Sequence, residues 1–425
     1  MYENLLAQDA LRTILEGDIA GGTLPPALLF SGPPASGKLT AALETARILS
    51  CQGTAAWNCG CSDCVRHRNL IHPDLLLLGK RSFPEEIIAA REFIGRSPGQ
   101  ASAYFFLRSI RKLLARFNPI LWKSDEAKLA KAASLIQSIE ESIDIIVPES
   151  LSAAVPAPVA AAINSAYGDA LSLEMLVPEA PSVTVIRNVG VWTQLAPSGK
   201  RKTVIVENAE HMQDSARNAM LKMLEEPPET VRFILLTSRR ASMMATILSR
   251  SRLYSFAPRD AAATERILAR VFKSEEMAPS LQAFFESRLP FPPSIAKLHA
   301  ERFIGRLLLD QGDESLRKGP YSLSLRSEAQ RSGKSMAELL NELAEATGNF
   351  GSKDKSMTGS FGHFIKALLS VFSGLLAEST GEPTLVALVD RWSRLARDAA
   401  VQYGSLNRSP DLLIRVLATS FGERA

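Results

Sequence analysis

The stretch Gly32-Pro33-Pro34-Ala35-Ser36-Gly37-Lys38 decides the fold that we expect for this sequence. Its glycines and its lysine have the Gly-x4-Gly-Lys spacing of a phosphate-binding loop. An apolar segment, Ala27 to Ser31, precedes it and a helix-forming segment, Leu39 to Ser50, follows it, which is the order that such a loop requires. A glycine turn that only happens to precede a lysine is the alternative. The flanking elements favour the phosphate-binding loop.

The loop offers several groups to the phosphates of a nucleotide. Glycine allows backbone N–H groups to turn toward phosphate oxygens, and the following helix adds the positive end of its dipole. Lys38 would place its ammonium group near the outer phosphates, and Ser36 lies inside the same loop. ATP binding by Gly32, Ser36, Gly37 and Lys38 is therefore open to this chain.

The residue after the lysine makes magnesium coordination doubtful. In a working loop this residue is Ser or Thr, and its hydroxyl binds Mg²⁺. Here it is Leu39, and Thr40 comes one residue later. An α-helix turns by about 100° per residue, so Thr40 should point away from the metal position. Thr40 remains a nucleotide-binding candidate, although it lies one residue after the position that usually carries the Mg²⁺-binding hydroxyl.

A second stretch, from Ser182 to Phe256, has the pattern of a parallel sheet. Its apolar runs Thr203 to Val206 and Phe233 to Leu236 are typical of buried strands. Between them we expect a helix that Asp214 caps and Pro227-Pro228 ends. Strand, helix and strand form the crossover of a parallel sheet. With a first helix over Asn4 to Glu16, the sequence predicts an α/β P-loop domain with flanking helices.

The first of these strands ends in Glu207-Asn208-Ala209-Glu210, where acidic residues of a P-loop enzyme would bind metal and polarise water. If Glu207 is the metal-side carboxylate, Asn208 stands where a catalytic carboxylate belongs. A neutral amide cannot accept a proton from water. We therefore expect little or no ATP hydrolysis by this chain, while nucleotide binding without turnover stays open.

All the cysteines of the chain lie close together, as Cys51-x7-Cys59-x-Cys61-x2-Cys64. Four thiolates on a short segment can bind one Zn²⁺ tetrahedrally, and with every position filled such a site is structural. A cytosolic compartment disfavours disulfides. Free reduced thiols are the alternative, since the single residue between Cys59 and Cys61 is a tighter gap than usual.

Length and composition predict a soluble protein of several domains. The chain has 425 residues, which suggests about three domains. Apolar residues make up 46% and charged residues 22%, close to average globular usage. No run approaches the roughly 18 apolar residues of a membrane span, and the N-terminus lacks the order of a secretory signal. We expect a cytoplasmic protein without membrane contact; a net charge of +4 permits nucleic acid as a partner but does not establish it.

The segment from about 82 to 181 differs in composition and is interpreted as a helical insertion. Residues 108–131 contain seven basic side chains against two acidic ones, and Phe105, Phe106, Phe117 and Trp122 lie beside or among them. One interpretation is a surface for nucleic acid or a partner. The other, which we favour, is an amphipathic helix with a packed aromatic face and a solvated basic face. The basic residues are Arg108, Arg111, Lys112, Arg116, Lys123, Lys128 and Lys131.

Beyond Pro258 the apolar spacing is helical to the end of the chain. Leu385, Leu388, Val389, Trp392, Leu395 and Ala396 form one stripe on one helix face. A last helix should begin at Ser409-Pro410, a cap followed by proline at the first helical position. The stretch Asp310 to Pro320 is rich in glycine and charge and is a plausible hinge.

These motifs together resemble those of bacterial DNA polymerase III clamp-loader subunits of the AAA+ class, the delta-prime type more than the ATP-hydrolysing gamma/tau type. The resemblance rests on Glu3 to Asp9, the phosphate loop, the cysteine cluster with His72-Pro73-Asp74, and above all the block from Asn218 to Arg252. It is good over 1–79 and 182–257, weaker over the C-terminal third and absent over the insertion.

The resemblance implies three domains: an AAA+ domain over 1–257, a small helical lid over 258–310 and a helical collar over 311–425. Such subunits form a hetero-pentameric ring with gamma/tau and delta subunits, which uses ATP to open the sliding clamp and place it on primer-template DNA. It also implies a sensor at Thr237 or Ser238, and an arginine finger at Arg250 that reaches a neighbour's ATP.

Loss of the hydroxyl at Leu39 and of the carboxylate at Asn208, with Arg250 kept, favours a delta-prime-type subunit that supplies a trans-acting arginine. A gamma/tau-like motor subunit is the alternative, and a P-loop nucleotide kinase is a third interpretation. Arg250 could also be an ordinary surface arginine after a strand, as Arg252 could be.

Overall fold

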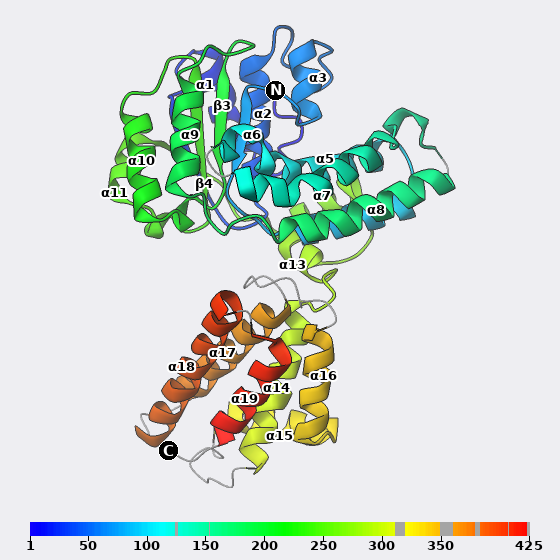
Figure 1. Ribbon diagram of the computed structural model, residues 1–425, viewed down its shortest axis with the longest axis vertical. Helices are drawn as coiled ribbons and strands as arrows, with labels where there is room; N and C mark the ends of the chain where they lie inside the picture. The colour runs from blue at the N-terminus through cyan, green and yellow to red at the C-terminus, as the bar shows by residue number, and fades with distance from the viewer. Residues whose placement is uncertain are drawn as a thin grey trace. The chain divides into compact units, whose positions relative to one another are not determined.

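The computed structural model describes residues 1–123, 126–152, 154–310, 319–348, 360–378, 383–406 and 408–422. The chain divides into two compact units, an α/β unit of Met1–Phe285 and a helical unit of Glu286–Ala425 (Figure 1). The boundary falls inside the segment that the resemblance assigns to a lid, 258–310. Each unit is described by itself.

A five-stranded parallel sheet in the order β2-β3-β4-β1-β5 forms the centre of the α/β unit. The strands are β1 Ala27–Ser31, β2 Leu75–Leu78, β3 Lys202–Val206, β4 Val231–Thr237 and β5 Arg252–Ser255. Because parallel strands end at the same edge of a sheet, the segments after β1, β2, β3 and β4 meet there. The predicted α/β fold is confirmed.

Helices cover both faces of this sheet. Alternate strand residues point to opposite sides, so Phe30 and Ile205 pack with α1 and α2, while Leu29 and Val204 pack with α9, α10 and α11 (Figure 1). The helices on the two faces are α1 Asp9–Ala20, α2 Lys38–Ser50, α9 Val183–Thr193, α10 Asp214–Glu225 and α11 Ala245–Arg250. Short 3-10 turns η3 Ala209–His211 and η4 Arg240–Ser242 follow β3 and β4.

Some local predictions were wrong. The first helix begins at Asp9 rather than Asn4. The cap of α10 is Gln213, whose extended backbone ends the preceding loop, so Asp214 is the first helical residue instead of the cap. Strands β2 and β5 were not predicted, because β2 is a short run of leucines and only Tyr254 of the edge strand β5 is buried.

The segment predicted as an insertion is helical, with a core of its own. It contains α4 Phe83–Arg96, α5 Gln100–Leu114, η1 Ala115–Phe117, α6 Pro119–Trp122, α7 Glu126–Asp144, η2 Pro148–Ser150 and α8 Ala157–Glu174. In Figure 1, α5, α7 and α8 lie side by side and extend away from the sheet. α12 Ala261–Val271 and α13 Leu281–Glu286 contact α4, through Phe272, Phe284 and Ala89 among others.

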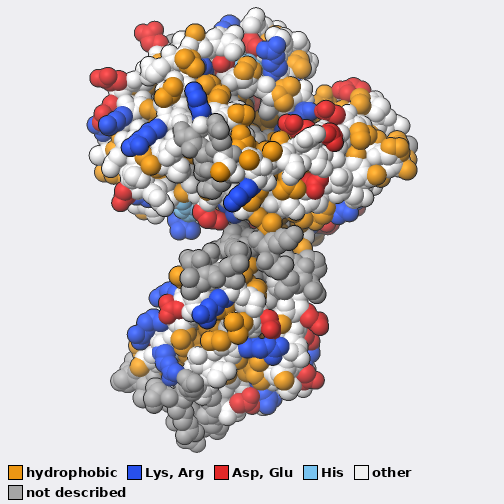
Figure 2. Space-filling view, in the orientation of Figure 1, with side chains coloured by type: hydrophobic (Ala, Val, Ile, Leu, Met, Phe, Trp, Pro, Cys, Tyr) orange, Lys and Arg blue, Asp and Glu red, His pale blue; other side chains and the backbone are white. Residues whose placement is uncertain are grey.

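Four cations of the basic run bond to protein groups of the α/β unit, while Lys123 and Lys131 are exposed. Its aromatic side chains Phe106, Phe117 and Trp122 are buried, as the amphipathic interpretation predicts. Its cations, however, bond to the protein: Arg108 to Arg68 O, Arg111 to Asn69, Lys112 to Glu86, and Arg116 to Gly79 O and Glu207. Because these four cations bond to the protein itself, they form neither a surface for nucleic acid or a partner nor a solvated basic face, and both interpretations were wrong for them. On the face in Figure 2, basic side chains alternate with acidic and apolar ones.

The helical unit packs around buried aromatic side chains, with Trp392 fully buried. Its helices are α14 Pro293–Asp310, α15 Pro320–Ser332, α16 Met336–Gly348, α17 Ser360–Glu378, α18 Pro383–Leu406 and α19 Pro410–Gly422. The stripe predicted on α18 faces this core, and Ser409 Oγ accepts a hydrogen bond from Leu412 N, which confirms the predicted cap. Most of the predicted hinge, 311–318, lies outside the described residues.

By length and composition, α17 is apolar enough to cross a membrane, and 61% of its most apolar window is buried. Phe364, Leu368 and Phe372 of this helix lie in the core of the helical unit. The long apolar run is therefore explained by packing between helices.

Candidate phosphate-binding loop and cysteine site

The segment 32–38 forms a loop between the end of β1 and the start of α2. Gly32 N donates to Thr237 O of β4 (3.2 Å), and a Cβ on Gly32 would lie 2.6 Å from the backbone and side chain of Phe256. Gly37 has a left-handed backbone (φ +99°) and precedes the first helical residue, Lys38. Both glycines are thus required, one by close packing and one by conformation.

Lys38 is held beneath the loop, close to acidic residues. Its Nζ donates to Gly32 O and Pro33 O, both at 2.6 Å. Burial lowers the pKa of Lys38 to about 8, although Glu210 and Glu207 oppose the shift. The predicted phosphate ligand therefore lies in the same site as the strand-end carboxylates.

The outer side of the loop is braced by two residues that the sequence analysis missed. Gln8 Nε2 donates to Ser36 O (3.2 Å) and to Ala257 O (2.8 Å). Arg259 donates to Ala35 O and to Leu6 O. The hydroxyl of Ser36 is buried without a hydrogen-bond partner. An orphaned hydroxyl in a loop of this shape fits a phosphate group.

The structure places an apolar side chain where a magnesium ligand is needed. Leu39 is the second residue of α2 and packs against the core between α1, α2 and the sheet. Thr40 follows it, turned by about 100° around the helix. Neither residue supplies the hydroxyl that holds Mg²⁺ in a working loop.

Glu207, the candidate metal carboxylate at the end of β3, is engaged by arginines. It is 8% exposed and forms a hydrogen-bonded ion pair with Arg116, while Arg81 Nη1 lies 3.9 Å from its other oxygen. Asn208 has a left-handed backbone (φ 49°), and its amide donates to Lys80 O (2.7 Å). The two residues therefore bind protein groups, and the residues present do not fit a magnesium ion.

Glu210 and Ser238 are joined to each other. Ser238 donates to Glu210 Oε1 from its backbone (3.1 Å) and from its hydroxyl (3.0 Å). Burial raises the pKa of Glu210, but hydrogen bonds from its own backbone, Thr237 and Ser238 outweigh it and lower the pKa overall. The predicted sensor position thus lies at the sheet edge with the acidic residues of the site.

Arg250 is at the end of α11, with its side chain 35% exposed. Its guanidinium pairs with Glu225 of α10 (2.9 Å) and donates to Thr246 O (3.1 Å). An ion pair this exposed is weak, so the guanidinium can exchange Glu225 for another anion at small cost.

The cysteines converge, although they come from different local structures. Cys51 follows α2, Cys59 lies in the connecting loop, and Cys61 and Cys64 are at the start of α3 Ser62–Arg68. Their sulfurs lie within 4.8 Å of one another, with Cys51 Sγ 3.6 Å from Cys59 Sγ and 3.9 Å from Cys61 Sγ. Zinc–sulfur bonds of about 2.3 Å in a tetrahedron separate sulfurs by about 3.8 Å. The four cysteines could therefore hold one zinc ion.

Neighbouring groups hold this cysteine segment in shape. Gly53 N and Ala55 N donate to Cys51 Sγ, both at 3.2 Å. Arg68 donates to Trp57 O and Cys59 O, and Arg47 of α2 donates to Ala55 O and Ala56 O. Backbone hydrogen bonds from Cys61 and Thr54 lower the pKa of Cys59 to about 6, which favours the metal-binding thiolate.

The sheet order and the loop after β1 define an α/β P-loop protein of the AAA+ type, followed by helical domains. A family model described as DNA polymerase III, delta subunit, matches residues 7–117 and 176–260. The match thus extends into both ends of the segment predicted as an insertion and leaves 118–175 unmatched.

Curated relatives agree with this family. A DNA polymerase III subunit delta' from Pseudomonas aeruginosa is 34% identical over 113 residues, 27% of this chain and 34% of that protein. The Escherichia coli subunit delta' is 45% identical over 60 residues, 14% of this chain and 18% of that protein. Replication factor C small subunit 1 from Pyrobaculum arsenaticum is 30% identical over 107 residues, 24% and 32% of the two chains.

The matched stretch spans about a third, or less, of the length of each of these relatives. A solved structure, a gamma subunit-related protein of DNA polymerase III from Thermotoga maritima, is similar with a TM-score of 0.30 at 23% identity, over 57% of this chain and 79% of that chain. The match to the family model, over 7–117 and 176–260, lies within the α/β unit.

Proposed function

We propose that this chain is a delta-prime-type subunit of a DNA polymerase III clamp loader, which lends an arginine to a neighbouring subunit and hydrolyses no ATP itself. The main support is the state of the strand-end site. Leu39 is half-buried and packs against the core, Asn208 binds Lys80 O, and Glu207 is paired with Arg116. The hydroxyl and the catalytic carboxylate that hydrolysis needs are both missing.

Arg250 has the exposure that a trans-acting arginine needs. Its guanidinium is partly exposed at the end of α11 and contacts the exposed Glu225, Thr246 O and Ser249 Oγ. An arginine from a neighbouring subunit can neutralise the charge that develops on a transferring phosphoryl group.

The proposal includes the assembly that the resemblance implies. Partners would be gamma/tau and delta subunits in a hetero-pentamer, the sliding clamp and primer-template DNA, in the cytoplasm. Residues 258–310 would act as the lid and 311–425 as the collar through which the subunits join. The cofactors would be one structural zinc ion on the cysteines, with nucleotide bound by the loop without turnover.

The test is a loader reconstituted with its partner subunits and this chain as wild type, Arg250→Ala or Arg252→Ala. Arg252 is a matched control, since it is two residues away and its side chain is 46% exposed. We expect Arg250→Ala to lower the DNA-stimulated ATPase rate by at least about tenfold, because an arginine finger contributes about 10³-fold or more. Assembly should be unchanged. Equal rates for the two variants would remove Arg250 from the proposal.

The intact loop and Lys38 favour one second candidate, a gamma/tau-like motor subunit. It is distinguished by the purified chain alone. Magnesium-dependent ATP hydrolysis that Lys38→Ala abolishes would support the motor and overturn the proposal.

A further inference from the structure

We infer that two guanidinium groups, those of Arg116 and Arg81, take the place of the divalent cation at Glu207, so that this loop is built to accept a phosphate anion without metal. The inference rests on the proposed nucleotide site and is independent of Arg250 and of assembly. The site has not merely lost metal ligands, because the carboxylate of Glu207 is present and already paired with cations.

The contacts define the substitution. Arg116 bonds to Glu207 Oε1, and Arg81 approaches Oε2 at 3.9 Å, so each carboxylate oxygen faces a cation. Arg116 Nε also donates to Gly79 O at 2.8 Å, which ties the guanidinium to the end of β2. A divalent cation at Glu207 would have to displace at least one of these groups or lie against its like charge.

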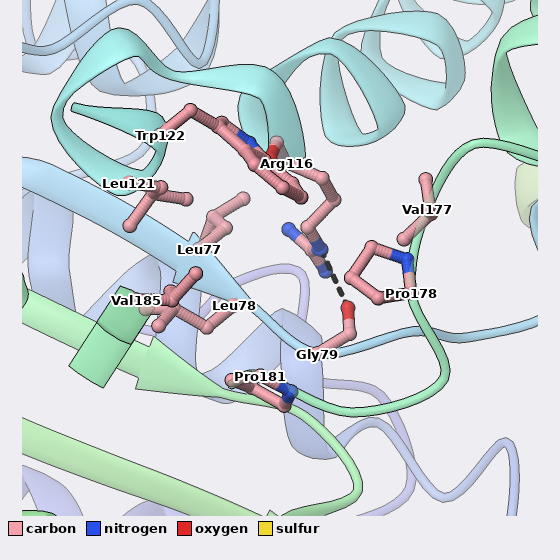
Figure 3. Close-up of a pocket in the computed structure, with 10 residues that line it drawn as sticks. All are labelled: Leu77, Leu78, Gly79, Arg116, Leu121, Trp122, Val177, Pro178, Pro181 and Val185. Carbon is pink, nitrogen blue, oxygen red and sulfur yellow. Dashed lines mark hydrogen bonds between the residues drawn. The ribbon is translucent and has the colours of Figure 1, made fainter. Parts of the chain in front are cut away.

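Arg116 cannot readily give up Glu207. Its side chain is 3% exposed, and Figure 3 shows its guanidinium among apolar side chains, with Trp122 above it and Leu77 and Pro178 on either side. One of its nitrogens, Nη1, is buried without a hydrogen-bond partner. Removing the counter-ion would leave a buried charge without compensation, a costly state. The pair is therefore a fixed part of the core.

Arg81, which faces the other carboxylate oxygen of Glu207, is also held by an ion pair. Its guanidinium pairs with Glu86 of α4 at 3.1 Å, and Glu86 also bonds to Lys112 of α5. The preceding residue, Lys80, pairs with Glu174 (3.4 Å) and Glu179 (3.0 Å). The arginines are thus positioned by contacts with the helical segments that pack beside the sheet.

The cations leave the loop suited to a metal-free anion. The loop after β1 and Glu207 after β3 lie at the same edge of the sheet, with β4 between their strands. With Leu39 in place of the hydroxyl ligand, the charge of a phosphate would be met by Lys38 and the backbone of the loop.

The experiment separates the role of Arg116 from that of Leu39. Binding of Mn²⁺ in the presence of ADP is measured by electron paramagnetic resonance on the full chain, as wild type, Leu39→Thr and Leu39→Thr with Arg116→Gln. We expect only weak binding of Mn²⁺ by the first two proteins, since the restored hydroxyl still faces a neutralised carboxylate. The double variant should bind Mn²⁺ at least about tenfold more tightly than Leu39→Thr.

Two outcomes would overturn the inference. One is tight Mn²⁺ binding by Leu39→Thr alone that is lost when Glu207→Gln is added. The other is a double variant that unfolds cooperatively but binds no more Mn²⁺ than Leu39→Thr. If Arg116→Gln prevents folding, Arg81→Gln replaces it, since the Arg81 side chain is 27% exposed. We then expect a smaller gain in Mn²⁺ affinity. No gain in affinity would contradict the inference. A failure here leaves the Arg250 experiment unaffected.

Discussion

Single glutamates determine where the arginines of the α/β unit lie. Glu86 pairs with Arg81 and Lys112, and Glu207 pairs with Arg116 and Arg81. Burial alone would raise the pKa of Glu86, but the charges of Lys112 and Arg81 outweigh it and lower the pKa to about 2. The negative form of Glu86 is therefore stabilised by folding.

This shift predicts a pH dependence of stability. A carboxyl whose pKa is lower in the folded state contributes stability above its unfolded pKa, 4.5, and that contribution is lost as the pH falls toward about 2. Glu86→Gln should cost about 3 kcal/mol in the free energy of unfolding at pH 7, because it leaves two cations with less compensation. The cost should shrink between pH 5 and pH 2, as denaturant titrations would show. A constant difference over this range would contradict the ion-pair assignment.

At the scale of elements, the segment between α2 and α3 has little core of its own. Of residues 51–61, Cys51 is buried and the others are half-buried or exposed; Cys64, within α3, is also buried. Its shape depends on bonds from Arg47 and Arg68 and on the convergence of the four sulfurs. A metal ion can add on the order of 10 kcal/mol to the folding of such a segment.

We therefore predict about one zinc ion per chain by elemental analysis. Removing it with a chelator should make the 51–64 segment sensitive to protease, since metal binding is coupled to folding. Cys64→Ser should lose the zinc, whereas the exposed neighbour Ser62→Ala should keep it. A zinc-free chain with the same protease resistance as the loaded one would leave the cysteines as free thiols.

At the scale of the whole molecule, the chain consists of two units with separate cores. Each hydrophobic cluster among the described residues lies entirely within 1–285 or entirely within 286–425. The helical unit includes α14, whose Phe303, Ile304 and Leu307 pack in its core. Cores that share no residues are expected to form independently.

Two fragments, 1–285 and 286–425, should therefore each fold when produced alone. We expect a single cooperative transition for each by circular dichroism, with a midpoint close to that of the same unit in the full chain. A fragment ending at residue 310, the end of the predicted lid, would include α14 without its partners and should aggregate more readily. If 1–310 folds well and 1–285 does not, the unit boundary lies at the lid instead.

Much of the α/β unit could be predicted from spacing within short segments. The glycines and lysine of the loop, strand β1 and the four cysteines are local patterns, and the structure places them as those patterns indicate. Strand β5 could not be predicted, because an edge strand with one buried side chain has no apolar run. Arg116 was noticed only as one member of a basic run.

The sequence by itself determined that a loop with Gly-x4-Gly-Lys spacing precedes α2, that parallel strands follow, and that four thiols share one segment. Only the tertiary structure decided what neutralises Glu207. Arg116 is 91 residues away from Glu207 in the chain. The periodicity of a sequence predicts only local structure, within one helix or one strand. Whether a buried cation meets its carboxylate or water depends on how β2, β3 and the helices after them pack, since burial is what makes the ion pair necessary.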